Sequence, residues 1–347
     1  MGNAHAVILA YARNHFDFRF FMHNSGIAVL AVTLTLTAAH AQQPAWKPER
    51  PLELIVAVSA GGATDKTARF VQSIVQKHRI VDAPIVIMNK PGGAGRIALS
   101  YLDQHPGDGH YVLNSTLTLL TNHILGLAKV NYTDYTMVAL LFSEPNTLVV
   151  PANSPLKSVR DIMEKLKRDP QSLSIAIGFS PGGINHLAAA RLLKQGGVDV
   201  RKLKTVVFQG QGAVYTALLG GHVDIAPMQV ANAVNGVQQG KLRILGIATE
   251  RRLDGALADI PTWKEQGYDL VWSNVRFMLG PKGMTPAQLA FWDATLERVV
   301  QTEEWKNEGR NNYLQLDYLG SKQVTPRIAS IYRQFKDAML EVGLIKE

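Results

Sequence analysis

The sequence predicts an α/β protein built of two lobes that share a hinge. Apolar runs typical of buried strands alternate with amphipathic helical stretches from residue 52 onward. A pair of glycines stands between a strand and a helix at three places in this alternation. The pattern starts again after Pro151, and no low-complexity linker separates the two halves. These observations favour two similar α/β units joined without a flexible tether.

The first half is expected to contain three strands, each followed by a helix. Val71 and Val75 share one face of the first helical stretch, as expected for a helix that covers a sheet. This order predicts a parallel, doubly wound sheet, because parallel neighbours need a crossover connection that is usually helical. The expected strands are residues 52–58, 84–88 and 111–114, and the expected helices are a stretch ending near residue 78, residues 95–104 and a short helix after residue 116.

The second half repeats the alternation of strands and helices and ends in helices. After Pro281 the chain has the pattern of two long helices with a short strand between them. The expected strands are residues 172–178, 205–208, 222–228, 242–249 and 313–317, and the expected helices are residues 159–169, 184–195, a stretch ending at residue 219, 286–301 and 321–343.

The composition excludes several classes of protein. The 347 residues are 46% hydrophobic and 18% charged, values near those of ordinary globular proteins, so global disorder, collagen and coiled coils are excluded. The chain has no cysteine, which excludes disulfide scaffolds, thiolate zinc sites and cysteine nucleophiles. Its net charge of +8 is scattered without a basic block, so the charge does not predict nucleic-acid binding.

The first 41 residues are predicted to be a signal peptide. Residues 26–39 are apolar but too few for a comfortable membrane span, and two arginines precede them. Residues 39–41, Ala-His-Ala, have the small-x-small pattern of a cleavage site. Cleavage near Ala41 would place the protein in the periplasm of a bacterium. A buried helix or a membrane anchor is the alternative, and Met22 is an alternative start.

The three glycine loops predict a site for an anion. They are Gly61-Gly62, Gly92-Gly93 and Gly182-Gly183. Glycine lets the backbone approach a ligand closely, and the first turn of a helix leaves N–H groups unpaired. Such a loop can bind an anion without a basic side chain, at the carboxyl ends of strands where open α/β sheets bind ligands. Ordinary strand-to-helix turns are the alternative.

Further polar residues accompany the predicted strand ends. His186 is expected either to donate a hydrogen bond to an anion or to lie on a helix surface. Asp65 is expected to pair with Arg69 one turn later, or else to hold the loop or contact an amino group. Asp224 would need a partner if buried, so it is either a structural acid or a ligand contact.

No catalytic, nucleotide-binding or metal-binding motif is present in the sequence. It lacks the P-loop, the G-x-G-x-x-G fingerprint with its downstream acid, the G-x-S-x-G elbow and H-E-x-x-H. The ten histidines are scattered. We therefore expect neither enzymatic activity nor a cofactor or a metal site.

Several segments together resemble a known family of receptors. The chain is similar to the extracytoplasmic solute receptors of tripartite tricarboxylate transporters, the Bug or TctC family, over about residues 50–345. The resemblance rests on segments that follow in family order and include LIVAVSAGGATDKTARF, VIMNKPGGAGRIALSYL, IGFSPGGINHLAAARLL and FQGQGAVYTALLGGHVDIAP.

The resemblance implies a fold and a function. The family fold is the type II periplasmic-binding-protein fold, two α/β lobes around a ligand cleft, here residues 46–148 plus 279–347 and residues 149–278. It implies capture of a small carboxylate, such as citrate, another tri- or dicarboxylate or an aromatic acid, and delivery to a membrane permease. A ligand-sensing receptor that feeds a signalling partner is the alternative. We expect no nucleic-acid partner, and we expect a monomer.

The resemblance also implies which residues contact the ligand. Backbone amides of the first-lobe loop and of the second-lobe loop would hold a carboxylate. Many members have a Trp-Tyr or Trp-Phe pair where this chain has Trp272-Ser273, and Arg276 shortly after it resembles the arginine of the citrate-receptor branch. Arg276 either binds a distal carboxylate or makes a surface ion pair. The expected ligand-binding residues are Ser59, Ala60, Gly61, Gly62, Ala63, Thr64, Asp65, Ser115, Thr116, Ser180, Pro181, Gly182, Gly183, His186, Gln209, Asp224 and Arg276.

Overall fold

The computed structural model describes residues 45–178, 181–208 and 210–346. These residues belong to one compact unit of the chain. The predicted signal peptide lies outside the described residues, as do the predicted site residues Ser180 and Gln209. Within the described ranges, no helix combines the length and the apolar character that crossing a bilayer requires.

The three strand–helix units expected in the first half are confirmed. Strands β1 (Leu52–Val56), β2 (Ile85–Asn89) and β3 (Tyr111–Thr116) pair in parallel in the order β2-β1-β3. They are followed by helices α1 (Ala63–Lys77), α2 (Arg96–Leu102) and α3 (Thr118–Ile124). The predicted apolar stripe of α1 is buried.

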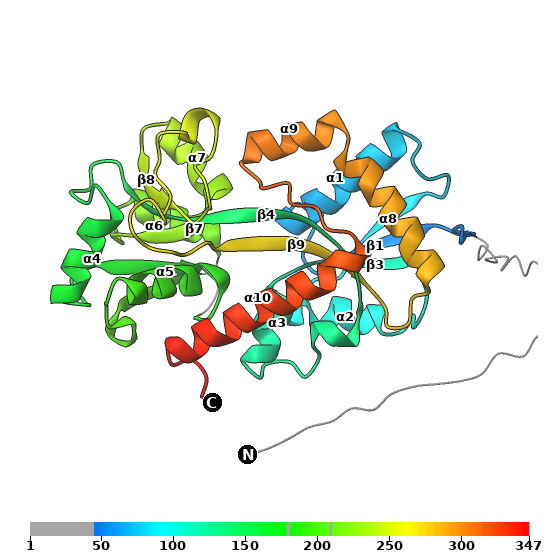
Figure 1. Ribbon diagram of the computed structural model, residues 1–347, viewed down its shortest axis with the longest axis horizontal. Helices are drawn as coiled ribbons and strands as arrows, with labels where there is room; N and C mark the ends of the chain where they lie inside the picture. Colours follow the sequence, from blue (N-terminus) through cyan, green and yellow to red (C-terminus); the bar gives the residue numbers. More distant parts are fainter. Residues whose placement is uncertain (1–44, 179–180, 209, 347) are drawn as a thin grey trace, which may run out of the picture. The chain divides into compact units, whose positions relative to one another are not determined.

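Two long strands join the sheet of the first half to the second half. β4 (Thr136–Pro151) pairs antiparallel with β9 (Ser273–Gly280) through its first part and with β7 (Ala226–Gln229) and β8 (Leu242–Ile247) through its last part. Figure 1 shows β4 and β9 side by side along this path. The parallel order predicted for the first three strands is confirmed, but the sheet as a whole is mixed, because β4 and β9 run antiparallel and neither was among the expected strands.

In the described residues of the second half, a separate two-stranded sheet is accompanied by four α-helices. β5 (Ser174–Gly178) and β6 (Lys204–Phe208) confirm two of the expected strands, and they pair in parallel. The helices are α4 (Val159–Arg168), α5 (Ile184–Gln195), α6 (Gln211–Leu219) and α7 (Val230–Gln238). The 3₁₀ turns of the described chain are η1 (Gly93–Gly95), η2 (Tyr132–Asp134), η3 (Val200–Lys202) and η4 (Gly255–Leu257).

The C-terminal helices cover both faces of the paired strands β4 and β9. α8 (Pro286–Val300) and α9 (Glu303–Asn312) join α1 in one apolar core with Phe142 and Met278. α10 (Ser321–Glu341) joins α2, α3 and α5 in another core with Val275 and Phe277. Side chains alternate along β9, so Arg276 lies on the face that α1 covers, where it bonds to Thr64.

Candidate functional site

The loop between β1 and α1 is held by the buried carboxylate of Asp65. One oxygen accepts hydrogen bonds from the Gly61 N–H at 2.8 Å and from Arg69 at 2.9 Å, and the other accepts from Asn89 at 2.8 Å. These hydrogen bonds, the one from Arg69 most of all, lower the pKa of Asp65 to about 2, although burial acts in the opposite direction. The expected pair with Arg69 is confirmed, and Asp65 also holds the loop.

This arrangement limits which amides of the loop can bind a ligand. The Gly61 N–H is bonded to Asp65, and the Gly62 N–H points to the carbonyl of Ser59 at 3.3 Å. Ala63 and Thr64 lie in the first turn of α1, where amides have no carbonyl partner within the helix. The free donors of this loop therefore lie at the start of the helix and not at the glycines.

Gly61 nevertheless faces open space. Its φ is +85°, a left-handed conformation that favours glycine, and a Cβ added there would meet no atom within 4 Å. Ser59 and Ala60 beside it are exposed. The surface of the loop is thus open to a small molecule.

Arg276 lies at the centre of the strands that cross between the two halves. In register it stands opposite Thr116 on β3 and Phe142 on β4. Its guanidinium donates to Thr64 Oγ1 at 3.0 Å and to Glu144 Oε2 at 3.1 Å, and its side chain is only 3% exposed. Arg276 is therefore a buried ion-pair partner, and the expectation of a surface ion pair is wrong.

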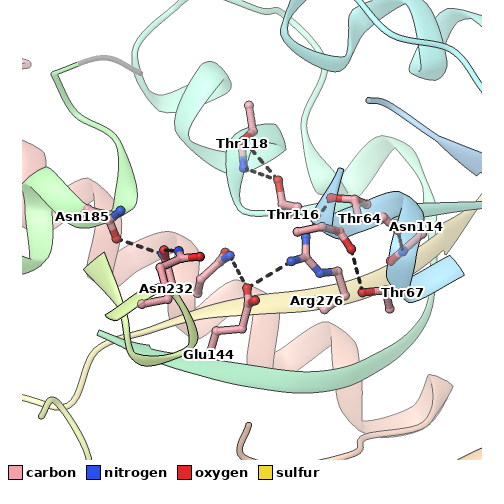
Figure 2. Close-up of polar contacts among 12 residues, drawn as sticks. Thr64, Thr67, Asn114, Thr116, Thr118, Glu144, Asn185, Asn232 and Arg276 are labelled. Carbon is pink, nitrogen blue, oxygen red and sulfur yellow. Dashed lines mark hydrogen bonds and ion pairs between the residues drawn. The ribbon is translucent and has the colours of Figure 1, made fainter. Parts of the chain in front are cut away.

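Ser115 and Thr116 end β3 close to this pair. Ser115 is buried, whereas the Thr116 hydroxyl accepts a hydrogen bond from the Thr118 N–H at 3.4 Å and bonds to the Thr118 hydroxyl at 3.1 Å. Thr116 therefore shapes the start of α3, and in the strand register it stands opposite Arg276. Figure 2 shows it beside the other polar residues of the site.

The loop between β5 and α5 is closed by packing in the part that the structure describes. Gly182 has a φ of +81°, and a Cβ added there would meet Leu125 at 3.2 Å and Leu344 at 3.4 Å. Its N–H donates to His186 Nδ1 at 2.9 Å. Pro181 is exposed, and Gly183 caps α5. Gly182 therefore serves close packing rather than an open approach to a ligand.

His186 is neutral at neutral pH. Burial lowers its pKa to about 4, because the charged form is poorly solvated in this environment. Since Nδ1 accepts from Gly182, the ring proton lies on Nε2, and only Nε2 can donate to a ligand. This is consistent with a helix-start histidine that supports the loop.

Asp224 lies apart from the other expected site residues. Its carboxylate accepts from the Ser174 N–H at 2.7 Å and from the Ser174 hydroxyl at 2.6 Å. Ser174 begins β5, whereas the glycine loop follows the other end of that strand. The structure therefore gives Asp224 the role of a structural acid and does not bring it to the site.

A cluster of amides, of which Asn146, Asn185 and Gln229 are buried, completes the polar centre of the molecule. Asn185, at the start of α5, accepts from Asn146 of β4 at 2.6 Å and from Gln229 of β7 at 2.9 Å. Gln229 in turn accepts from Asn232 of α7 at 3.1 Å. Neither these residues nor Glu144 were among the ligand-binding residues expected from the sequence. For Glu144 and Asn146 the signal was the polar run Ser-Glu-Pro-Asn-Thr, residues 143–147, inside an otherwise apolar strand.

A pocket of about 250 Å³ lies beside this polar centre. Its walls come from the start of α1, from α7 and α9, and from the crossing strands β4 and β9. Figure 2 shows four of its lining residues, Thr67, Glu144, Asn232 and Arg276. The lining residues are Ala63, Lys66, Thr67, Phe70, Phe142, Glu144, Ala231, Asn232, Arg276, Trp305, Glu308, Asn312, Leu314 and Leu316.

Neither the other hollow of the surface nor a metal centre competes with this pocket in the described part of the chain. A larger, mostly apolar hollow of about 650 Å³ lies between residues 45–48, residues 80–83 and α8, and none of the expected site residues lines it. Among the residues that the structure describes, no group of three or more histidines and acids is placed to hold a metal ion. The polar pocket is therefore the candidate ligand site.

Known proteins resemble this chain over most of its length. The model of the family described as Tripartite tricarboxylate transporter family receptor matches residues 67–337. The UPF0065 protein in the gbd 5' region of Cupriavidus necator is 28% identical over 337 residues, which are 94% of this chain and 98% of the relative. The matched range contains the strands of the pocket and all but the first residues of its helices.

Solved structures share the fold. The crystal structure of a TctC solute binding protein from Polaromonas has a TM-score of 0.73 at 26% identity and covers 85% of this chain and 99% of its own. MatC from Rhodopseudomonas palustris, solved with bound malate, has a TM-score of 0.67 at 23% identity, with coverage of 85% and 99%. This likeness confirms the periplasmic-binding-protein type of fold that the family resemblance implied.

Proposed function

The chain belongs to the family of tripartite tricarboxylate transporter receptors, and from this premise we propose that it captures a small carboxylate in the periplasm and delivers it to a transporter permease. The family consists of solute-binding receptors, and the proposal assigns no catalysis to this chain. The observation that carries the proposal is the pocket to which α1, α7 and both crossing strands contribute.

The start of α1 supplies what a carboxylate needs. Ala63 lines the pocket, and the amides of the first helical turn carry partial positive charge. Gly61 leaves the space in front of the loop open, and Asp65 fixes the loop before a ligand arrives. A preorganised donor set of this kind reduces the entropy lost on binding.

The pocket also couples binding to closure. Ala63 belongs to the first half of the fold and Asn232 to the second. A ligand that contacts both residues therefore stabilises a closed conformation of the protein over an open one. A receptor can then present its ligand-bound form to a permease as a distinct conformation. Bound malate in MatC, a protein of the same fold, supports the choice of a small acid as the ligand.

A thermal-shift screen tests the proposed ligand class. Ligands that bind the folded protein raise its melting temperature by mass action. The screen contains mono-, di-, tri- and aromatic carboxylates, with neutral sugars as the matched non-acidic set. We expect at least one small carboxylate to raise the melting temperature. A clear shift with sugars and none with any acid would contradict the proposal.

A further inference from the structure

Glu144 is the acidic group on the strand wall of the pocket. It stands in the middle of β4, opposite Asn274 of β9, and its side chain is only 14% exposed. An acid at this position costs free energy unless it is paired, because burial removes its hydration. Its presence in a site proposed to bind anions therefore calls for an explanation.

The two oxygens of Glu144 have different surroundings. Oε2 accepts from Asn274 at 2.6 Å and from Arg276 at 3.1 Å. Within residues 45–178, 181–208 and 210–346, the structure gives Oε1 no hydrogen bond. Because Glu144 lines the pocket, Oε1 is an acceptor available to a ligand.

Because of the ion pair, the charge of Arg276 is already balanced before a ligand binds. The guanidinium is already bonded to Glu144 and Thr64, so a distal ligand carboxylate would meet the negative charge of Glu144 beside it. In the described part of the chain, Arg276 Nε and Asn274 Oδ1 are buried without a partner. Such atoms usually bond to a water or a ligand that completes the site.

We propose that Glu144 selects acids that carry a hydrogen-bond donor, a hydroxyl or an ammonium group, in addition to their carboxylate. The inference rests on the proposed function and names the ligand class of the same pocket. The ligand carboxylate lies at the start of α1, and its donor bonds to Glu144 Oε1. Arg276 and Asn274 are positioning residues that orient Glu144 through Oε2.

The size of the pocket agrees with such a ligand. A volume of about 250 Å³ admits an acid of a few carbon atoms together with water. Ala63 and Glu144 line the same small space, so one short molecule can contact both. A ligand without a donor would leave Oε1 desolvated and unpaired, which weakens its binding.

The test is a calorimetric titration with matched acids on the full mature protein. The first series is succinate, malate and aspartate, which share four carbons and differ in bearing no donor, a hydroxyl or an ammonium group. Glutarate, 2-hydroxyglutarate and glutamate form a longer series, and tricarballylate and citrate form a tricarboxylate pair. We expect the hydroxyl or the ammonium member of the series that binds to have a Kd lower than that of the plain acid by about tenfold or more.

Substitution of Glu144 tests the residue itself. Glu144→Gln keeps an oxygen for Arg276 and Asn274 and turns its amide NH₂ toward the pocket, so the preference should fall to within about twofold. Glu250→Gln is the matched control, because Glu250 is 66% exposed and pairs with Lys264 outside the pocket. The control should keep the full preference. Melting curves of both variants check that they fold.

The outcomes separate this inference from the proposed function. If the plain acids bind the wild type as tightly as their substituted partners, the role of Glu144 is refuted while carboxylate capture stands. If no acid binds at all, the proposed function is refuted, and the inference about Glu144, which rests on it, is refuted as well. If Glu144→Gln does not fold, the wild-type comparison still decides. Retention of the preference in a folded Glu144→Gln protein also overturns the inference.

Discussion

The ion pair between Arg276 of β9 and Glu144 of β4 should make the effects of substituting the two residues on the free energy of unfolding non-additive. At 3.1 Å and an effective dielectric constant of about 20, the attraction between the charges is about 5 kcal/mol before desolvation is subtracted. Removing one partner of a buried pair typically costs 3–5 kcal/mol, because the other charge is left uncompensated. Glu144 is partly exposed, so we expect about 3 kcal/mol for Arg276→Met and about 2 kcal/mol for Glu144→Gln.

A double-mutant cycle measures this coupling. The double variant has no uncompensated charge, so its loss of stability should be smaller than the sum of the single losses by about 2 kcal/mol. Urea unfolding followed by the fluorescence of the five tryptophans gives the free energy of each variant. Losses that add to within about 0.5 kcal/mol would show that the pair does not act as a unit, and would refute the reasoning.

Three further predictions concern His186, the glycine loops and the N-terminus. Because the pKa of His186 is about 4 in the folded protein and about 6.5 in the unfolded chain, the unfolded chain takes up the proton first as the pH falls. The free energy of unfolding, measured with urea, should therefore decrease by about 3 kcal/mol as the pH is lowered from 6.5 to 4. A His186→Gln protein whose stability shows the same dependence on pH would contradict this. Gly61→Ala should lower the stability by about 1 kcal/mol and should also weaken acid binding in calorimetry. Gly182→Ala should lower the stability and leave acid binding largely unchanged, because Gly182 packs against other side chains. The opposite pattern would exclude the roles given to the two loops. Mass spectrometry of the protein from a bacterial periplasm should give a chain that starts at Gln42, and the intact mass would contradict cleavage.

The sequence was sufficient for the regular strand–helix units. β1, α1 and α5 were predicted because apolar runs, glycine loops and helical periodicity occur together in each unit. Helix α5 has the predicted bounds, residues 184–195. Local patterns are reliable in these units because each strand is buried and each helix shows one apolar face.

The strands that cross between the halves were not predictable in the same way. β4 carries a polar run, residues 143–147, where a buried strand should be apolar. Those side chains pair with partners far away in sequence, as Glu144 does with Asn274 and Arg276. The sequence therefore presented Arg276 as a residue without a known partner, and only the pairing of β4 with β9 reveals that Glu144 neutralises it.

The glycine loops show a similar limit. The sequence indicated that Gly61 and Gly182 have the same purpose, since each precedes a helix. In the fold, Gly61 faces open space, whereas Gly182 packs against Leu125 and Leu344. The difference depends on residues that become neighbours only in the folded chain, so no local pattern could have indicated it.

The most direct measurement is calorimetry with an acid and its uncharged amide. Malate and malamide have the same carbon skeleton, and only malate presents carboxylates to the amides at the start of α1. If another acid gives the largest thermal shift, it and its amide replace this pair. A saturable heat with one acid per protein and none with the amide is the predicted result. Equal binding of both members would contradict capture of an anion by this pocket.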